Sequence, residues 1–441
     1  MPGAAPGAPA FPPVPRIDCE GALMLTAEQN GLLTQTDAGT PMGELMRRYW
    51  IPITIADRIV AGGAPLPIKI LGEALVVFRS PSGEAGLMAE SCPHRNASLA
   101  LARNEDCGLR CLYHAWLVAP DGRVLETPPE PPEVNLSDKF KHPAYPCREA
   151  GGIVWAYLGR EEAMPEFPEW IFEPYDDDKI YATNAFQDCN WLQGLEGDLD
   201  AQHGPYLHYT DDEAHTQDGL QNRANEYIHD QRPKVAAARR PWGLQTVFRY
   251  LHKDGKAATY WIHPFVMPFF TFFESNLLDT EGALMHAWVP ATDESHWVWS
   301  VLFSESAMTD DYLEFVDRTR GYGMTDPANN WRVTAFTGEG VGYEQDRALM
   351  ASGRSFSGIE GILQQDLAIQ YSMGPVSDRT REHLTSGDIA IVQVRKYLLD
   401  TLAAVGDGEP APGTKPGSQE GIVFEALTAE PDASMRELAA R

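Results

Sequence analysis

The sequence predicts a two-domain α+β protein, in which an all-β domain precedes a domain of strands and helices. Residues 51–160 contain short runs rich in Val, Ile and aromatic residues, separated by Gly, Pro and Ser turns. A stretch rich in proline and acidic residues, 164–179, is typical of a linker. Beyond it, strand-like runs over 245–303 are followed by segments with helical periodicity.

In chain order, residues 1–23 form a Pro/Ala/Gly-rich tail that we expect to be disordered. The first domain then covers 24–165, with short helical turns leading into its strands. The second domain covers 166–405 and includes predicted helices near 309–320, 359–371 and 379–402. We expect the remainder, 406–441, to be a flexible extension, because it begins with the linker-like sequence GDGEPAPGTKPGSQEG.

Composition narrows the class of protein. A net charge of −28, from 35 basic and 63 acidic residues, argues against nucleic acid or an anionic membrane as a partner. Six cysteines in 441 residues are too few for a disulfide scaffold. The N-terminus has no basic or apolar leader region, and no window approaches a membrane-spanning apolar run. We therefore expect a soluble cytoplasmic protein.

The first candidate metal site consists of two mixed pairs, Cys92-Pro-His94 and Cys111-Leu-Tyr-His114. A common zinc finger groups its cysteines first and its histidines afterwards, whereas here each pair offers one thiolate and one imidazole. Two such loops suit a [2Fe-2S] cluster with both cysteines on one iron and both histidines on the other, the Rieske arrangement. Residue type, order and spacing all match it, so a chance grouping is the weaker interpretation.

The other cysteines lack ligand spacing. Cys107 could pair with Cys111, but no second pair of that kind follows, so we interpret Cys107 as a free buried thiol. The same interpretation applies to Cys19, Cys147 and Cys189.

A second candidate metal site lies in residues 190–208. Leucines and a tryptophan recur every four residues and predict the buried stripe of a helix: Trp191, Leu195 and Leu199. Spacings of three and four place a second set on a different face: Glu196, Asp200 and His203. Gly204-Pro205 ends that helix, and a new turn there can bring His208 beside His203. Two histidines and a remote carboxylate form the facial triad that binds non-haem Fe(II) and leaves positions open for oxygen.

The remaining histidines have no other candidate metal ligands near them at a suitable spacing in the sequence. We expect His215, His263, His286 and His383 to be structural. His263 and His286 lie in strand-like runs and could line a cavity.

Together these motifs resemble the oxygenase α subunit of the Rieske non-haem iron aromatic-ring oxygenases, in particular the phthalate dioxygenase-like branch. The resemblance covers roughly residues 24–402. It rests on GTPMGELMRRYWIP, CPHRNASL, GLRCLYHAW, CNWLQGLEGDLD and QQDLAIQYSMGPVSDRTREHL. It implies that the second domain is a helix-grip fold, an antiparallel sheet wrapped round a helix with an apolar cavity.

The resemblance also implies the role of each site residue. The cluster ligands would be Cys92, His94, Cys111 and His114. The mononuclear iron would be bound by His203, His208 and Asp366, the last preferred over Glu360, Asp378 and Asp388. Asp200 would link the two centres.

Two positions depart from the family pattern. Ala115 stands where the family usually has glycine, so we expect that its backbone does not need a positive φ. Glu196 stands where the naphthalene dioxygenase branch has asparagine, so the pocket chemistry of that branch should not be transferred.

The predicted reaction needs a partner. The chain has no plant-type ferredoxin cysteine set and no flavin or nicotinamide fingerprint, so its electrons should come from NADH through a separate reductase. The first hypothesis is hydroxylation of a small aromatic substrate with O2, with dioxygenation of an aromatic carboxylate as its leading form. Monooxygenation or O-demethylation of an aryl ether shares every motif and stays open. A pure electron-transfer Rieske protein is the distant alternative, because it would need no iron triad.

Two further expectations concern substrate charge and assembly. A substrate carboxylate would need a fixed cation, and the candidates follow the iron helix: Arg223, Arg232, Arg239, Arg240 and Arg249. The family resemblance implies a homotrimer or hexamer whose active unit spans two chains, with Asp200 between a cluster histidine of one chain and an iron histidine of its neighbour.

Overall fold

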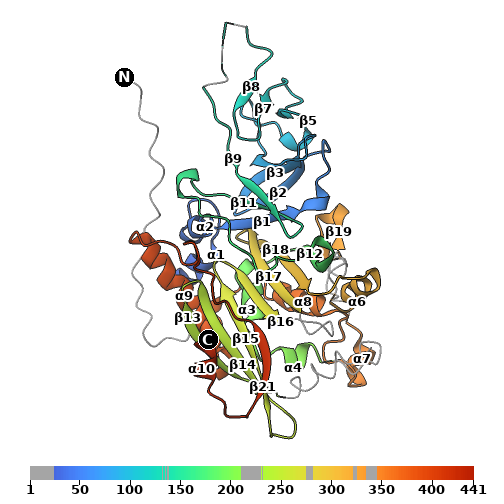
Figure 1. Cartoon of the computed structure of the whole chain (residues 1–441), viewed down its shortest axis with the longest axis vertical. Helices are drawn as coiled ribbons and strands as arrows, with labels where there is room; N and C mark the ends of the chain where they lie inside the picture. Colours follow the sequence, from blue (N-terminus) through green and yellow to red (C-terminus); the bar gives the residue numbers. More distant parts are fainter. Residues whose placement is uncertain are drawn as a thin grey trace.

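Three small antiparallel sheets form the first domain of the computed structural model (Figure 1). The model describes residues 24–131, 133–134, 136, 139–209, 230, 232–274, 282–320, 325–333 and 345–441. The first sheet has the order β1-β11-β10: Trp50–Ile55, Ile153–Tyr157 and Cys147–Ala150. The second has the order β2-β3-β4-β9: Leu66–Ile70, Glu73–Arg79, Ala85–Ala89 and Ala144–Tyr145. The third has the order β5-β6-β7-β8: Arg103–Glu105, Gly108–Arg110, Leu117–Val118 and Val124–Glu126. The all-β prediction for this domain is confirmed.

Two short helices precede these strands. Helix α1 (Ala27–Thr34) begins with a capping box, in which the Thr26 side chain accepts from the Gln29 backbone and the Gln29 side chain accepts in return. Helix α2 (Pro41–Met46) begins at a proline, which suits the first turn because it has no N–H to leave unpaired. Both helices contact α9 (Ile389–Gly406), so this lead-in packs on the second domain.

The second domain is built on one ten-stranded sheet. Its order is β13-β14-β15-β16-β17-β18-β12-β20-β19, with β21 paired to β15. The bounds are β12 Ile180–Gln187, β13 Lys234–Arg240, β14 Gly243–Leu251, β15 Ala258–Val266, β16 Phe270–Glu274, β17 Gly282–Thr292, β18 Ser295–Ser304, β19 Thr325–Asp326, β20 Arg332–Val333 and β21 Glu425–Ala429. Every pairing is antiparallel except that of β12 with β20. The predicted combination of antiparallel sheet and helices is confirmed.

Helices α3 and α9 cover one face of this sheet, which we call the inner face, and α10 lies on the other. Helix α3 contacts β17 and β18, and α9 contacts β13 and β14. Among the described residues, the α-helices of this domain are α3 Trp191–Asp198, α4 Gly204–Leu207, α6 Asp310–Arg320, α7 Arg347–Ala351, α8 Ile362–Ser372, α9 Ile389–Gly406 and α10 Met435–Ala439. Short 3-10 turns occur throughout the described chain at Ala56–Arg58, Leu99–Leu101, Glu161–Ala163, Asp177–Lys179, Pro327–Asn329, Arg379–Arg381 and Ser386–Asp388.

Alternation along β15 separates the two faces of the sheet. Trp261 and Phe265 pack into the main core with the covering helices. Tyr260 and Ile262 pack into a second cluster, together with Leu438 of α10. Side chains on a strand alternate between faces, so His263 shares the inner face with Trp261 and Phe265.

The predicted linker 164–179 is largely packed rather than free. Trp170 and Phe172 are buried, and their rings stack against Trp155 of β11 at centroid distances of 5.1 and 6.3 Å. Large aromatic side chains bury much apolar surface, and this burial outweighs the polar composition of the segment.

The C-terminal residues differ from the flexible extension that their composition predicts. Strand β16 pairs with β15 only at Phe265 and Val266, and β21 pairs with the other half, Ala258–Ile262. Helix α10 then packs on β13 and β14, with Leu438 buried. An unpaired strand edge leaves backbone groups without partners, and β21 supplies those partners here.

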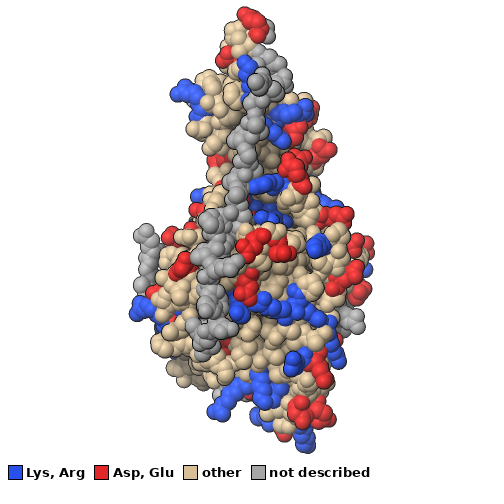
Figure 2. All heavy atoms as spheres, turned by 90° about the vertical axis from the view of Figure 1, so that its left-hand side faces the viewer, with Lys and Arg blue, Asp and Glu red and all other residues tan. Residues whose placement is uncertain are grey.

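The described surface mixes charges of both signs. Figure 2 shows Lys and Arg side chains interspersed with Asp and Glu over one face. Among the residues that the model describes, no helix is both long enough and apolar enough to cross a membrane.

Candidate metal centres

The two Cys-His loops have the same backbone hydrogen bonds. In each loop the cysteine carbonyl accepts the N–H of the residue four positions ahead, and the cysteine N–H donates to the carbonyl five ahead. The distances are 2.9 Å (Asn96 to Cys92), 3.0 Å (Ala115 to Cys111), 2.8 Å (Cys92 to Ala97) and 2.9 Å (Cys111 to Trp116). Two loops of one shape therefore present their cysteines in equivalent ways.

This shared shape requires a left-handed residue four positions after each cysteine. Asn96 has φ 58° and Ala115 has φ 60°. Asparagine visits this region readily, but a Cβ makes it costly for alanine, by about 1–2 kcal/mol. The expectation that Ala115 would not need a positive φ is wrong, because the loop geometry is kept without the glycine.

The cysteines and the histidines of the two loops differ in how deeply they are buried. Cys92 and Cys111 are buried, at 1% and 3% exposure, whereas His94 is exposed and His114 is half-buried. The two imidazole rings lie 4.4 Å apart, and the ring of His94 stacks on Trp116 at 4.8 Å. Burial raises the pKa of the Cys92 thiol, and the adjacent Cys111 thiol raises it further. Two buried thiols and two outward imidazoles fit the donor set of a Rieske cluster.

The other cysteines take no part in this arrangement. Cys107 lies in the turn between β5 and β6 and is exposed, so the interpretation of a buried thiol is wrong there. The next residue must be glycine, because a Cβ at Gly108 would collide with the backbone carbonyl of Val118. Cys189 is buried and Cys147 is half-buried, while Cys19 lies outside the described residues.

The second candidate site brings together two histidines and one carboxylate. The Nε2 atoms of His203 and His208 lie 3.1 Å apart. Asp366 Oδ1 of α8 lies 3.6 Å from His203 Nε2 and 3.4 Å from His208 Nε2. Within the described part of the chain, this is the one group of three or more His, Cys, Asp or Glu side chains close enough to hold a metal ion.

Local structure explains why the histidines meet. The helical stripe predicted for Trp191, Leu195 and Leu199 is fully buried and anchors α3 on the sheet. Helix α3 ends at Asp198, and α4 begins at Gly204 with Pro205 in its first turn. The prediction that this helix continues to Gly204-Pro205 is wrong, because α3 ends at Asp198 and leaves Asp200 and His203 beyond it rather than on one helical face with Glu196. The new turn predicted at Gly204 is present as α4, and His208 lies beside His203.

A further residue that sequence analysis missed orients His208. His203 Nδ1 donates to the backbone carbonyl of Asp200 at 2.8 Å, since a carbonyl can only accept. His208 Nδ1 donates to Gln365 Oε1 at 2.6 Å, and Gln365 Nε2 donates to the Ile359 carbonyl at 2.8 Å. Both Nε2 atoms are thereby left facing Asp366. The only sequence signal for Gln365 was its place next to Asp366.

Asp200 reaches the site chiefly through its backbone. Its carboxylate accepts the N–H of Gln202 at 2.7 Å and lies 3.8 Å from His203 Nδ1. The side chain is partly exposed, so within one chain this carboxylate has an open side.

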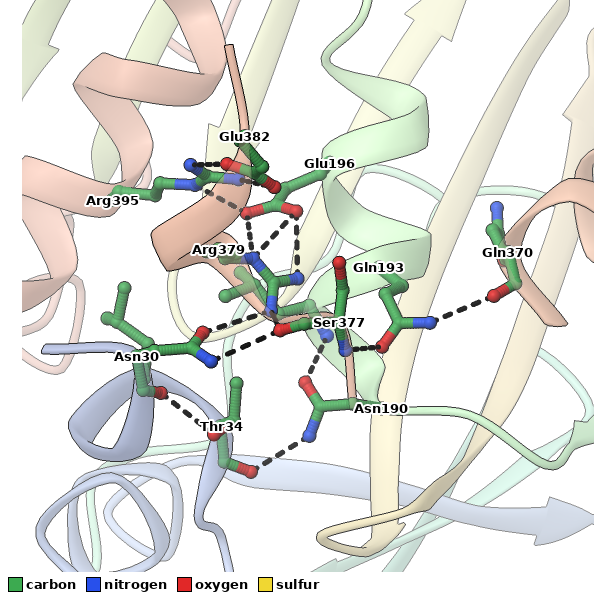
Figure 3. A network of polar contacts seen from close by, with 12 residues as sticks. Asn30, Thr34, Asn190, Gln193, Glu196, Gln370, Ser377, Arg379, Glu382 and Arg395 are labelled. Carbon is green, nitrogen blue, oxygen red and sulfur yellow. Dashed lines mark hydrogen bonds and ion pairs between the residues drawn. The ribbon is translucent and has the colours of Figure 1, made fainter. Parts of the chain in front are cut away.

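A buried ionic network holds α3 against the 3-10 turn Arg379–Arg381 and α9 (Figure 3). Glu196 pairs with Arg379 at 2.8 Å and with Arg395 at 2.6 Å. Burial alone would raise the pKa of Glu196, but the two guanidinium charges outweigh it and hold the pKa below its usual value. Glu196 is therefore a structural anion rather than part of the metal site.

Gln193 adds neutral contacts to the same network. Its side chain donates to the carbonyls of Gln370 and Gly374 and accepts the N–H of Ser377 (Figure 3). Because Gln370 lies on α8, these bonds join the histidine-bearing segment to the helix that carries Asp366.

The arginines considered for a substrate carboxylate lie elsewhere in the described structure. Arg239 pairs with Asp400, and Arg249 lies 3.7 Å from Asp230 on the face that packs α10. Arg232 is exposed and Arg240 ends β13, while Arg223 is outside the described residues. His215 is also outside them.

Comparison with known proteins agrees with this geometry. Residues 49–146 match the Rieske [2Fe-2S] domain family, and residues 156–429 match the family described as LigXa C-terminal domain like. The phthalate 4,5-dioxygenase oxygenase subunit of Pseudomonas putida is 34% identical over 401 residues, covering 89% of each chain. This chain belongs to the Rieske non-haem iron aromatic-ring oxygenases, in the phthalate dioxygenase-like branch.

Other relatives of this Rieske oxygenase subunit have varied names. The 3-chlorobenzoate-3,4-dioxygenase oxygenase subunit of Comamonas testosteroni is 32% identical over 90% of this chain and 93% of its own. The 5,5'-dehydrodivanillate O-demethylase oxygenase subunit of Sphingobium sp. is 30% identical over 88% and 82%. The solved NdmA structure of Pseudomonas putida CBB5 has the same fold, with a TM-score of 0.56, 19% identity, and coverage of 83% of this chain and 94% of that one.

Proposed function

We propose that this Rieske oxygenase subunit hydroxylates an aromatic carboxylate, using O2 and electrons from a separate NADH-dependent reductase. The observation that carries the proposal is the convergence of His203, His208 and Asp366 from α4 and α8 in a chain that also holds two matched Cys-His loops. An electron carrier alone would have no use for such a triad. Because its reductant is NADH, we place the enzyme in the cytoplasm.

In this proposal each ligand has one role. Cys92, His94, Cys111 and His114 hold the [2Fe-2S] cluster, and the His203, His208 and Asp366 triad holds the iron. When bound, the cluster supplies single electrons and the iron activates dioxygen. Asp200 and Gln365 fix the histidine tautomers by accepting from the Nδ1 atoms. The buried residues of α3 anchor the segment that leads to the histidines on the sheet.

The carboxylate substrate is supported by the names of two relatives, a phthalate and a chlorobenzoate dioxygenase subunit. O-demethylation of an aryl ether is the second candidate, favoured by the name of a third relative, the 5,5'-dehydrodivanillate O-demethylase oxygenase subunit.

Product analysis separates the two candidates. The holoenzyme, with a matched reductase and isotopically labelled O2, should be supplied with phthalate, chlorobenzoates and methoxybenzoates. Dioxygenation places both labelled atoms on the ring, whereas demethylation releases formaldehyde and leaves a phenol. If no aromatic acid or aryl ether in the panel gives an oxygenated product, the proposed function is wrong.

Metal analysis tests the assignment of ligands. We expect about three irons and about two acid-labile sulfides per chain, without stoichiometric zinc. Cys111→Ser should lose the cluster absorption in visible light, and Cys107→Ser should keep it. Stoichiometric zinc without sulfide would contradict the ligand assignment.

We also propose a homotrimer or hexamer in which the cluster of one chain serves the iron of the next. Figure 1 shows β5, β7 and β8 at one end of the molecule and α4 near the other, which separates the two centres within a chain. The open side of the Asp200 carboxylate would then face His94 or His114 of a neighbouring chain.

A further inference from the structure

The segment that leads to the iron histidines crosses the inner face of the sheet. At one end the Asp198 carboxylate accepts from Thr271 of β16 at 2.5 Å, and from His286 and Trp288 of β17 at 3.0 and 3.1 Å. At the other end the Ala201 carbonyl accepts from the Tyr250 hydroxyl of β14 at 2.9 Å. Strand β15 lies between β14 and β16, so its inner face lies beneath this segment.

His263 is the polar residue that β15 presents on its inner face, beneath this segment. It shares the inner face with Trp261, whose ring contacts Tyr250 at 5.9 Å. Residues two apart on a strand lie about 7 Å apart, so the next inner-face residue after Trp261 is His263. His263 therefore lies close to Tyr250, whose hydroxyl donates to the Ala201 carbonyl of the segment that leads to the iron histidines. The edges of Phe248 and Phe273 flank its ring at 5.4 and 5.3 Å.

The Nε2 atom of His263 is buried without a hydrogen-bond partner among the described residues. The side chain is 4% exposed. Buried polar atoms in folded proteins are nearly always paired, because an unpaired one forfeits its hydration. An unpaired nitrogen between two aromatic rings, beneath the segment that leads to the iron histidines, is a place where a ligand can supply the missing bond.

A second buried histidine shows what is particular to this position. His296 also has an Nε2 atom without a partner among the described residues, but its Nδ1 donates to the Cys189 carbonyl at 2.6 Å, before the start of α3. It lies at the opposite end of α3 from the metal segment. His296 therefore serves as the matched control.

Charge around His263 favours a neutral ligand. Burial lowers the pKa of His263 to about 4, so the imidazole is neutral at pH 7. For Asp198, burial would raise the pKa, but His286 and its other partners outweigh it and keep the carboxylate ionised. In the described parts of β14 to β18, no Lys or Arg faces the inner side, where a substrate carboxylate would meet the charge of Asp198.

We propose that His263 determines substrate specificity by donating a hydrogen bond from Nε2 to a neutral ring oxygen, a hydroxyl or methoxy group, of the aromatic substrate. Phe248 and Phe273 would then contact the ring. This inference rests on the proposed function. It adds that a hydroxyl or methoxy substituent of the substrate lies against the sheet, whereas a carboxylate of the same substrate points away from it.

Paired probes of equal charge and similar shape test it. The iron-loaded holoenzyme is titrated by calorimetry with the 2-, 3- and 4-isomers of methoxybenzoate and of ethylbenzoate, which differ in one oxygen. For the best isomer, the wild type should bind the methoxy compound about tenfold more tightly, as one hydrogen bond allows. His263→Leu and His263→Met, which lack a donor, should reduce this ratio to about one. His263→Asn should restore part of it.

The control is His296→Leu, which should keep the wild-type ratio. A ratio near one in the wild type, an unchanged ratio in the donor-less variants, or equal loss in His296→Leu would overturn the inference. These outcomes leave the proposed function standing if the protein still forms oxygenated products. Absence of product from every aromatic compound would instead remove the proposed function.

Discussion

Single residues next to the ligands decide how the iron site is oriented. Gln365 accepts from His208 Nδ1 and is itself fixed by the Ile359 carbonyl, so it determines the ring position of His208. Partners of this kind usually contribute a factor of about 10–100 to metal affinity. Asp200 does the same for His203 through its backbone, where a substitution cannot remove the acceptor.

Gln365→Leu should therefore lower iron affinity by about 10–100-fold and leave the cluster intact. The measurement is competitive chelation of the mononuclear iron, with cluster absorption recorded on the same sample. Gln370→Leu is the control, because Gln370 is a buried glutamine on the same helix that lies against α3. Equal iron affinity in the Gln365 variant and the wild type would contradict the positioning role.

The backbone conformation of Ala115 should lower the stability of the cluster domain. Its φ of 60° is costly for alanine, whereas glycine adopts this conformation freely but loses more entropy on folding. Ala115→Gly should therefore raise the stability of the cluster domain by about 0.5–1 kcal/mol. Ala97→Gly, in the matching loop but without a positive φ, should lower it. The readout is the urea midpoint for loss of cluster absorption, and a lower midpoint for Ala115→Gly would refute the strain.

At the scale of elements, the Glu196 network fixes α3 relative to the 3-10 turn Arg379–Arg381 and α9. The Arg379 side chain is fully buried and that of Arg395 nearly so. Removing the shared carboxylate leaves two buried cations partly unpaired, which typically costs about 3–5 kcal/mol. Glu196→Gln should lose that much stability in denaturant unfolding. Asp400→Asn, which removes the exposed pair with Arg239, should lose less than about 1 kcal/mol.

The pH dependence of stability should report the same network. The folded pKa of Glu196 is depressed, so its contribution is complete above its unfolded value, about 4.3, and is lost as the pH falls through the folded pKa. The acid limb of the stability profile should consequently be shallower in Glu196→Gln. An identical acid limb would show that folding does not lower the pKa of Glu196.

Sequence predicted those elements whose local pattern determines them. The buried stripe of α3, the turn at Gly204-Pro205 and the meeting of two histidines follow from periodicity and helix-ending residues. The burial of Trp170 and the pairing of β21 depend on distant segments, and no local pattern encodes them. Gln365 was missed for the same reason, since its partner lies 157 residues away. The positive φ of Ala115 is local to its loop, but the alanine at a position where the family usually has glycine hid it.

At the scale of the whole molecule, the proposed assembly depends on Asp200. Its carboxylate is partly exposed and only 3.8 Å from His203 Nδ1, so a neighbouring chain could complete its hydrogen bonds. Asp200→Asn should keep all metals and the oligomer, yet slow electron transfer from the reduced cluster by at least about a hundredfold in single-turnover experiments. Sedimentation checks the oligomer. A fully active monomer, or an unchanged single-turnover rate, would contradict the shared site.

The pairing of β21 with β15 has a consequence for how the chain can be shortened. None of the proposed metal ligands lies beyond Asp366, so a fragment that stops at residue 405 would keep them all. It would also uncover the backbone of Ala258–Ile262 and the apolar patch beneath Leu438. A bare strand edge recruits strands from other molecules. Such a fragment would therefore aggregate although it keeps every proposed metal ligand. For the same reason, an affinity tag should be placed at the N-terminus.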